Sequence, residues 1–112
     1  MTNLQRLLLE VQSINLQQDE LSIYLQENDL QPHNEYIPSS QLNKRNIYRT
    51  ALSILESIAN NPATMKNYKM DDTTVSDFSD NIQNRIDQLE RKIRTMPIDE
   101  QTDSNYFMLF NS

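Results

Sequence analysis

The strongest constraint in this sequence is an apolar stripe between Ser76 and Met96. Large apolar residues recur there at intervals of three or four positions: Phe78, Ile82, Ile86, Leu89, Ile93 and Met96. This spacing places them on one side of an α-helix, because a helix completes a turn about every 3.6 residues. We therefore expect a helix over residues 76–96 whose apolar side packs against the rest of the chain.

The polar residues of this segment fit the same helix. Ser76 is a good N-cap, and Pro97 cannot continue a helix and so predicts its end. Acidic residues fall near the start and basic residues near the end, where the helix dipole favours each charge. Two acid-first pairs four residues apart are expected to stabilise the exposed side: Asp87 with Arg91 and Glu90 with Arg94.

The preceding part of the chain predicts three further helices. Apolar residues at helical spacing indicate two short helices, over residues 3–12 and 19–26, and a long one over residues 41–60 that begins after Ser39 or Ser40. Residues 29–40 contain two prolines and no periodic pattern, so we expect a loop held in place by Tyr36 and Ile37.

Two segments carry no helical pattern. Residues 62–75 include Thr73, Thr74 and Val75, which favour an extended backbone, so we expect an ordered loop with a short strand or hairpin. The fold class is therefore an all-α small helical bundle with two short N-terminal helices and two long helices. Its domain spans residues 1–97, and residues 98–112 are expected to form a flexible, extended docking tail.

Composition excludes most enzyme classes. The chain has no cysteine, and it has no glycine for phosphate-binding loops, nucleophile elbows or dinucleotide-binding turns. His33 stands alone in the proline-containing loop and is expected on the surface. The acidic residues Asp71, Asp72, Asp77 and Asp80 lack the spacing of a calcium loop. We expect no catalytic residues, no cofactor and no metal site.

Charge and apolar residues point instead to protein contacts. The chain ends in five consecutive large apolar residues, Tyr106, Phe107, Met108, Leu109 and Phe110. They either dock on a partner, which we favour, or fold back into a gap in the chain's own core.

Lys44, Arg45 and Arg49 make the middle of the chain basic, whereas Asp19 and Glu20 belong to an acidic N-terminal third. This polarity is either an ordinary solvated surface or a complementary pair of surfaces for head-to-tail contact between copies.

The order of these segments resembles a known family. Short helices lead to a long helix ending at Ala59-Asn60-Asn61. A loop then enters the last helix through Thr74-Val75-Ser76-Asp77-Phe78, and a tail follows. This layout, over residues 3–96, resembles the small head–tail connector (head-completion, adaptor) proteins of tailed bacteriophages. The missing glycine departs from many members, whose central loop often has one before the segment matching Thr74-Val75-Ser76.

The resemblance implies a virion structural protein without enzymatic activity. Such proteins form homo-oligomeric rings, commonly twelve-fold, that join the portal vertex to the next tail-side component, and they are assembled in the host cytoplasm. It implies that Tyr106–Phe110 dock on the portal or a neighbouring subunit. The residues implied to face the tail-side partner are Lys66, Tyr68, Lys69, Met70, Asp71 and Asp72. DNA is expected to pass through the ring without specific binding, which suits the net charge of −6, and no membrane contact is expected.

Two other functions can be weighed from the sequence. A small intracellular regulatory module could bind a partner helix along the stripe of residues 78–96, provided that the stripe is not buried within the monomer. A DNA-binding helix-turn-helix over residues 3–26 is disfavoured, because its second helix carries Asp19, Glu20 and Glu27 and no basic residue.

Overall fold

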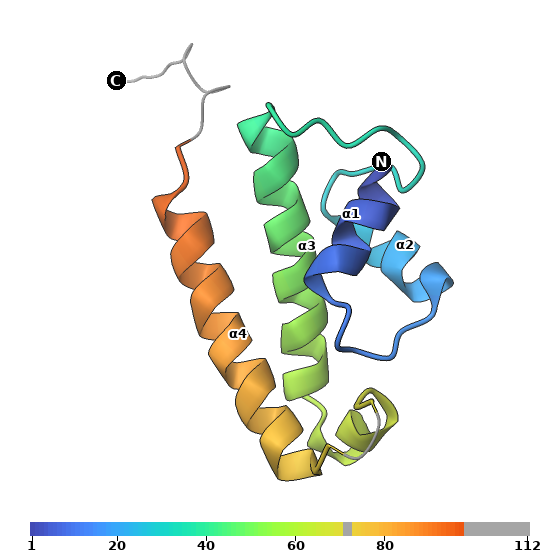
Figure 1. The fold of residues 1–112 in the computed structure, drawn as a ribbon, viewed down its shortest axis with the longest axis vertical. Helices are drawn as coiled ribbons and strands as arrows, with labels where there is room; N and C mark the ends of the chain where they lie inside the picture. The colour runs from blue at the N-terminus through green and yellow to red at the C-terminus, as the bar shows by residue number, and fades with distance from the viewer. Residues whose placement is uncertain (71–72, 98–112) are drawn as a thin grey trace.

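The structure, a computed structural model, describes residues 1–70 and 73–97 (Figure 1). These residues form four α-helices and one 3-10 helix: α1 (Asn3–Glu10), α2 (Gln18–Glu27), α3 (Gln41–Ala59), η1 (Pro62–Asn67) and α4 (Val75–Thr95). No strand is present in this part of the chain, and the prediction of an all-α bundle with two short and two long helices is confirmed.

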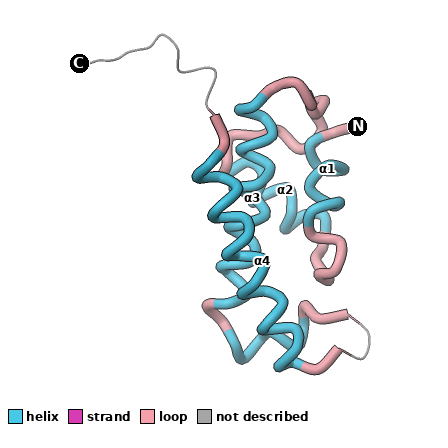
Figure 2. The backbone as a smooth tube through the Cα atoms, turned by 60° about the vertical axis from the view of Figure 1, so that its left-hand side comes forward, coloured by secondary structure: helices cyan, strands magenta, loops and turns pink. Residues whose placement is uncertain are grey.

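Helix α3 is the central element of the bundle. Helix α4 runs antiparallel along one side of α3, and the short helices α1 and α2 cover another side (Figures 1 and 2). The 3-10 helix η1 packs at the end where α3 leads into α4. All other helices therefore depend on the apolar surface of α3.

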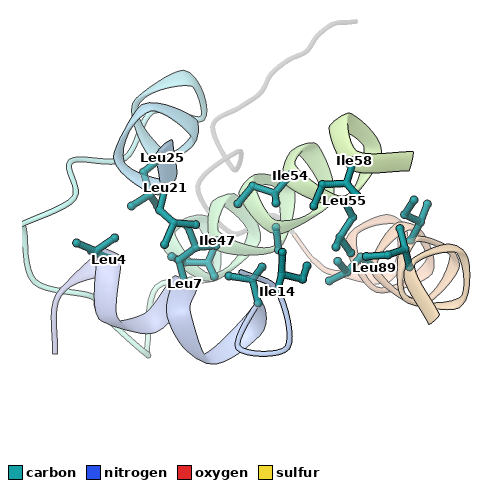
Figure 3. Packing of buried hydrophobic residues seen from close by; sticks show 14 of the residues in the cluster. Leu4, Leu7, Ile14, Leu21, Leu25, Ile47, Ile54, Leu55, Ile58 and Leu89 are labelled. Atoms are coloured by element: carbon teal, nitrogen blue, oxygen red, sulfur yellow. The ribbon is translucent and has the colours of Figure 1, made fainter. Parts of the chain in front are cut away.

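A single apolar core joins these elements. Figure 3 shows Leu21 and Leu25 of α2 and Leu4 and Leu7 of α1 converging on α3, with Leu89 of α4 on a further side. The stripe predicted for α4 is confirmed in its main part, since Phe78, Ile82, Ile86 and Leu89 are all buried. Ile93 and Met96, at the end of the stripe, are half-buried.

The loop between α2 and α3 is held to the start of α1 by polar contacts. Asn3 is buried. Its side-chain NH₂ group donates a hydrogen bond to the backbone carbonyl of Gln31, and its side-chain oxygen accepts one from the side chain of Asn43. Tyr36 is buried as expected, whereas the Ile37 side chain is exposed. The backbone N–H of Ile37 donates a hydrogen bond to the side-chain oxygen of Asn43. The loop is thus held by Tyr36, as predicted, and also by asparagine side chains.

The end of α2 shows how a chain without glycine closes a helix. Asp29 has a φ of 64°, in the left-handed region where glycine is usual. The N–H of Asp29 donates to Gln26 O, and the N–H of Leu30 donates to Leu25 O, which is the Schellman pattern. The side chains of Leu25 and Leu30 are both buried, so this turn also contributes to the core.

The prediction of a strand or hairpin within residues 62–75 is wrong for the described part of that segment. Pro62 instead starts η1, in a position where its fixed φ suits a helix and its missing N–H is not needed. Met65, in the middle of η1, is buried in the core. Further along, Thr74 keeps the extended backbone that its residue type favours, but it is the N-cap of α4 and pairs with no described strand.

The beginning of α4 also differs from the expectation. Its N-cap is Thr74, not Ser76, and the Thr74 hydroxyl accepts a hydrogen bond from the N–H of Asp77. The sequence offers two hydroxyl residues two positions apart, and Thr74 allows an additional half-turn of helix. Its end is as predicted: the helix stops at Thr95, and Met96 is extended, as a residue before proline prefers to be.

The other predicted helix ends agree within two residues. Helix α1 stops at Glu10 rather than residue 12, and α3 stops at Ala59 with Asn60 as its C-cap. Ser40 is the N-cap of α3, because its hydroxyl accepts a hydrogen bond from the N–H of Asn43.

A matched pair of isoleucines tests the core. Ile54 of α3 is fully buried, whereas Ile23 of α2 is 56% exposed. We expect Ile54→Ala to lower the free energy of unfolding by about 2–5 kcal/mol, because it removes buried methyl groups and leaves a cavity. Ile23→Ala should change it by less than about 0.5 kcal/mol. Urea denaturation followed by circular dichroism measures both, and equal effects would contradict the packing described here.

A second pair tests the start of α4. Thr74→Ala is expected to lower the free energy of unfolding by about 0.5–2 kcal/mol, because the N–H of Asp77 loses its acceptor. Ser76→Ala, inside the first turn, should have a smaller effect. If denaturation shows the larger loss for Ser76→Ala, the cap lies where the sequence alone placed it.

Candidate interaction surfaces

The principal ionic site of the described chain is centred on Glu10 of α1, which a long side chain of α4 reaches. The Glu10 carboxylate accepts a hydrogen bond from Arg6 at 2.9 Å, one turn earlier on α1, and another from Arg85 of α4. The Glu10 side chain is only 12% exposed, and Arg6 is 16% exposed. The carboxylate is therefore paired on both oxygens by guanidinium groups, and the Arg85 side chain is the more exposed of the two, at 32%.

Two tyrosines complete this cluster. The Arg6 guanidinium lies 5.4 Å from the ring centroid of Tyr36 and 5.8 Å from that of Tyr48. The ammonium group of Lys92 lies 4.8 Å from the ring centroid of Tyr48. Because these distances are within cation–π range, the tyrosine of α3 links the cations of α1 and α4. We call Arg6, Glu10, Tyr36, Tyr48, Arg85 and Lys92 the cation–tyrosine cluster.

The electrostatics of this cluster keep Arg6 charged. Burial by itself lowers the pKa of Arg6, but the interactions with Glu10 and Tyr36 outweigh it, so the pKa is raised above its ordinary value. An arginine already charged at neutral pH becomes still harder to deprotonate. Arg6 thus contributes a fixed positive charge to the cluster.

A pocket of about 280 Å³ lies beside the cluster. It is enclosed by the α1–α2 connection, α3 and the first half of α4, and its lining residues are Glu10, Ser13, Ile14, Leu55, Thr73, Phe78, Asn81, Ile82 and Arg85. Ser13 and Thr73 bring hydroxyl groups to this lining. The carboxylate in the lining belongs to Glu10 and is already paired with two arginines. Among the described residues that line the pocket, no unpaired carboxylate or histidine stands beside these hydroxyls to act as a base.

The predicted tail-side loop lies at the end of the molecule where α3 passes into α4 (Figure 2). Lys66 and Met70 are exposed there, while Tyr68 and Lys69 are half-buried. The carbonyl of Tyr68 accepts a hydrogen bond at 2.8 Å from the N–H of Asn15, so the loop is tied to the connection between α1 and α2. Asp71 and Asp72 lie outside the described residues.

The predicted docking residues Tyr106, Phe107, Met108, Leu109 and Phe110 also lie outside the described residues. The last described residue, Pro97, stands at the end of α4 that is opposite η1. The chain thus leaves the bundle at one end, and the loop after η1 lies at the other.

The charged residues predicted for contacts between copies lie on two flanks of α3. Arg45 lines a shallow groove with Arg94 on the α4 side, and Arg49 is exposed one turn further along α3. Asp19 and Glu20 lie in the first turn of α2, on the other flank (Figure 1). Lys44, near the start of α3, is half-buried. The structure thus separates the positive and negative groups into two surfaces.

The structure also bears on the predictions for His33 and for the two charged pairs of the last helix. His33 is exposed, as predicted. The pairs Asp87–Arg91 and Glu90–Arg94 do not occur among the ion pairs of the described residues. Asp87 accepts a hydrogen bond from Gln83, and the arginine of α4 that forms an ion pair is Arg85, with Glu10 as its partner.

Sequence reasoning missed the cation–tyrosine cluster. Arg6 and Glu10 show the four-residue spacing of a helical pair, which was a usable signal. Nothing in the sequence indicated the partner of Glu10 on α4, because Arg85 is 75 residues away.

No family model, curated protein or solved structure matches this chain. Within residues 1–70 and 73–97, no group of three or more histidine or acidic side chains is arranged to hold a metal ion. None of the helices described is both long and apolar enough to cross a membrane.

The cluster can be tested with two glutamates. Glu10→Gln leaves the shielded Arg6 and the partly exposed Arg85 without their counter-ion, so we expect the free energy of unfolding to fall by about 1–3 kcal/mol. Glu56→Gln makes the same chemical change at an exposed position on α3 and should be nearly neutral. Urea denaturation compares them, and similar stabilities for the two variants would show that the cluster contributes little.

Proposed function

We propose that this chain is a head–tail connector subunit of a tailed bacteriophage, a non-enzymatic adaptor that assembles into a ring between the portal and the tail. The observation that carries the proposal is the position of its two candidate partner-binding segments. The segment containing Tyr106–Phe110 begins at one end of α4, and the loop containing Lys66–Met70 lies at the other. At about 1.5 Å per residue, the 21 residues of α4 separate these ends by roughly 30 Å.

This arrangement suits a protein that connects two others. A rigid helical pair holds the two segments apart, so that one end can contact the portal while the other contacts the tail-side component. Since α3 and α4 share a continuous apolar interface, the separation is maintained by the core rather than by a linker. The helical fold is the fold class that the resemblance implies.

The separation of charge supports assembly into a ring. A basic surface that includes Arg45 and Arg49 lies on one flank of α3, and an acidic surface with Asp19 and Glu20 lies on the other. Surfaces of opposite sign on different flanks favour head-to-tail contact, and head-to-tail contacts that close by rotation form rings. The overall acidity of the chain suits a DNA channel to which the duplex does not adhere.

The alternative function is a regulatory module that binds a partner helix along the α4 stripe. That function requires an exposed stripe. Four residues of the stripe are buried against the chain's own core, and only Ile93 and Met96 are partly exposed. A partner helix could not lie along the stripe without displacing α3.

The experiment is native mass spectrometry of the full chain, alone and mixed with portal rings encoded by the same genome. We expect a ring or a portal complex. The variant Y106S/F107S/L109S/F110S should lose portal binding, because it removes the apolar docking side chains. A control, L9S/I37S, replaces two exposed apolar residues outside the proposed sites and should retain binding.

Two results would overturn the proposal. One is a full chain that stays monomeric with every portal tested. The other is a four-serine variant that supports virion assembly as well as the unaltered chain does.

A further inference from the structure

The groove between α3 and α4 has an unusual combination of groups. It is about 340 Å³ and is lined by Arg45 and Leu52 of α3 and by Glu90, Ile93 and Arg94 of the second half of α4. Leu52 and Ile93 are half-buried and give the groove an apolar floor. We call this the α3–α4 groove.

The rim of the groove is positively charged. The Nε of Arg45 is buried and has no hydrogen-bond partner among the described residues. Neither Arg45 nor Arg94 takes part in an ion pair between described residues, and Arg49 adds a third cation nearby on α3. Glu90 is the carboxylate that lines the groove, so the rim retains a net positive charge. A buried donor without an acceptor favours an incoming carboxylate.

The chain carries a segment of complementary chemistry directly after this site. Residues 98–112 follow Pro97, which stands one turn beyond Arg94. The segment begins with Asp99, Glu100 and Asp103, contains no basic residue, and continues into Tyr106–Phe110. An extended chain covers about 3.3–3.6 Å per residue, so the acidic part can reach Arg94 and Arg45, and the aromatic part can reach further along α3.

We propose that residues 98–112 bind in the α3–α4 groove of their own chain. The carboxylates of Asp99, Glu100 and Asp103 pair with Arg45 and Arg94, and the aromatic residues cover Leu52 and Ile93. Binding within one chain needs no second molecule, and the segment starts beside the site.

This inference rests on the proposed function for its biological meaning. The segment cannot occupy its own groove and a portal at the same time, so the groove competes with the portal for Tyr106–Phe110. It keeps a run of five large apolar residues covered until the portal is present, which protects the free subunit from aggregation.

The test is paramagnetic relaxation enhancement on the full-length chain. Because the natural sequence has no cysteine, Ser112→Cys provides a single site for a nitroxide spin label. We expect the label to broaden the amide signals around Leu52 and Ile93 selectively, and not those of α2. The broadening should weaken at high salt, because salt screens the carboxylate–arginine attraction.

Two charge-reversal variants of equal net charge provide the comparison. R45E/R94E should lose the selective broadening, whereas K66E/K69E, at the opposite end of the bundle, should keep it. Circular dichroism confirms that each variant is folded. Should R45E/R94E fail to fold, D99N/E100Q/D103N serves in its place, because it removes the same attraction from outside the described bundle.

Three outcomes would overturn the inference. The broadening could be absent or spread evenly over the surface, or it could survive removal of the charges. It could also arise only between chains, which a mixture of spin-labelled chain with isotope-labelled, spin-free chain would reveal. None of these results depends on the portal, so the inference and the proposed function can fail separately.

Discussion

The packing of α4 and the two short helices onto α3 is the interaction on which the rest of this structure depends. Isolated helices shorter than about 12–15 residues are marginal in water, and α1 and α2 contain 8 and 10 residues. Each is held by two or more leucines directed at α3, as Figure 3 shows for Leu7 and Leu25. The short helices therefore exist because α3 offers them an apolar surface, and the candidate binding segments keep their positions for the same reason.

The cation–tyrosine cluster adds specificity to this apolar packing. Leucines and isoleucines can interdigitate in several registers, whereas the Glu10 carboxylate has to lie within reach of both Arg6 on α1 and Arg85 on α4 to pair with them. Tyr48 reinforces that arrangement, because its ring lies near cations from both helices. Since Arg6 remains charged, the arrangement does not depend on its protonation state. The polar cluster thus fixes the orientation of helices whose attraction is mainly apolar.

The helices were predictable from the sequence because each has a periodic apolar side and a recognisable end. The stripe of α4, the N-cap at Ser40 and the end before Pro97 could all be read in this way. Local preference was misleading at Val75, where the extended tendency of a β-branched residue gives way to the first turn of α4, although Thr74 before it is extended. The cation–tyrosine cluster depends on helix packing, and no local pattern encodes which arginine of α4 faces α1. Arg94 and Arg45 likewise gain their shared groove only through the antiparallel pairing of α3 and α4.

The Arg85–Glu10 pair has a consequence for the order in which the molecule folds. Helices α3 and α4 are joined by residues 60–74, so their pairing closes a smaller loop than the Arg85–Glu10 pair, whose residues are 75 positions apart. Because the entropic cost of loop closure rises with length, we expect the α3–α4 hairpin to form early and the Arg85–Glu10 pair to form late. Helices α1 and α2 can pack on α3 as soon as α3 is present, and only the Glu10–Arg85 pair has to wait for α4. The first helix of this sequence thus gains its last ionic partner from the last helix.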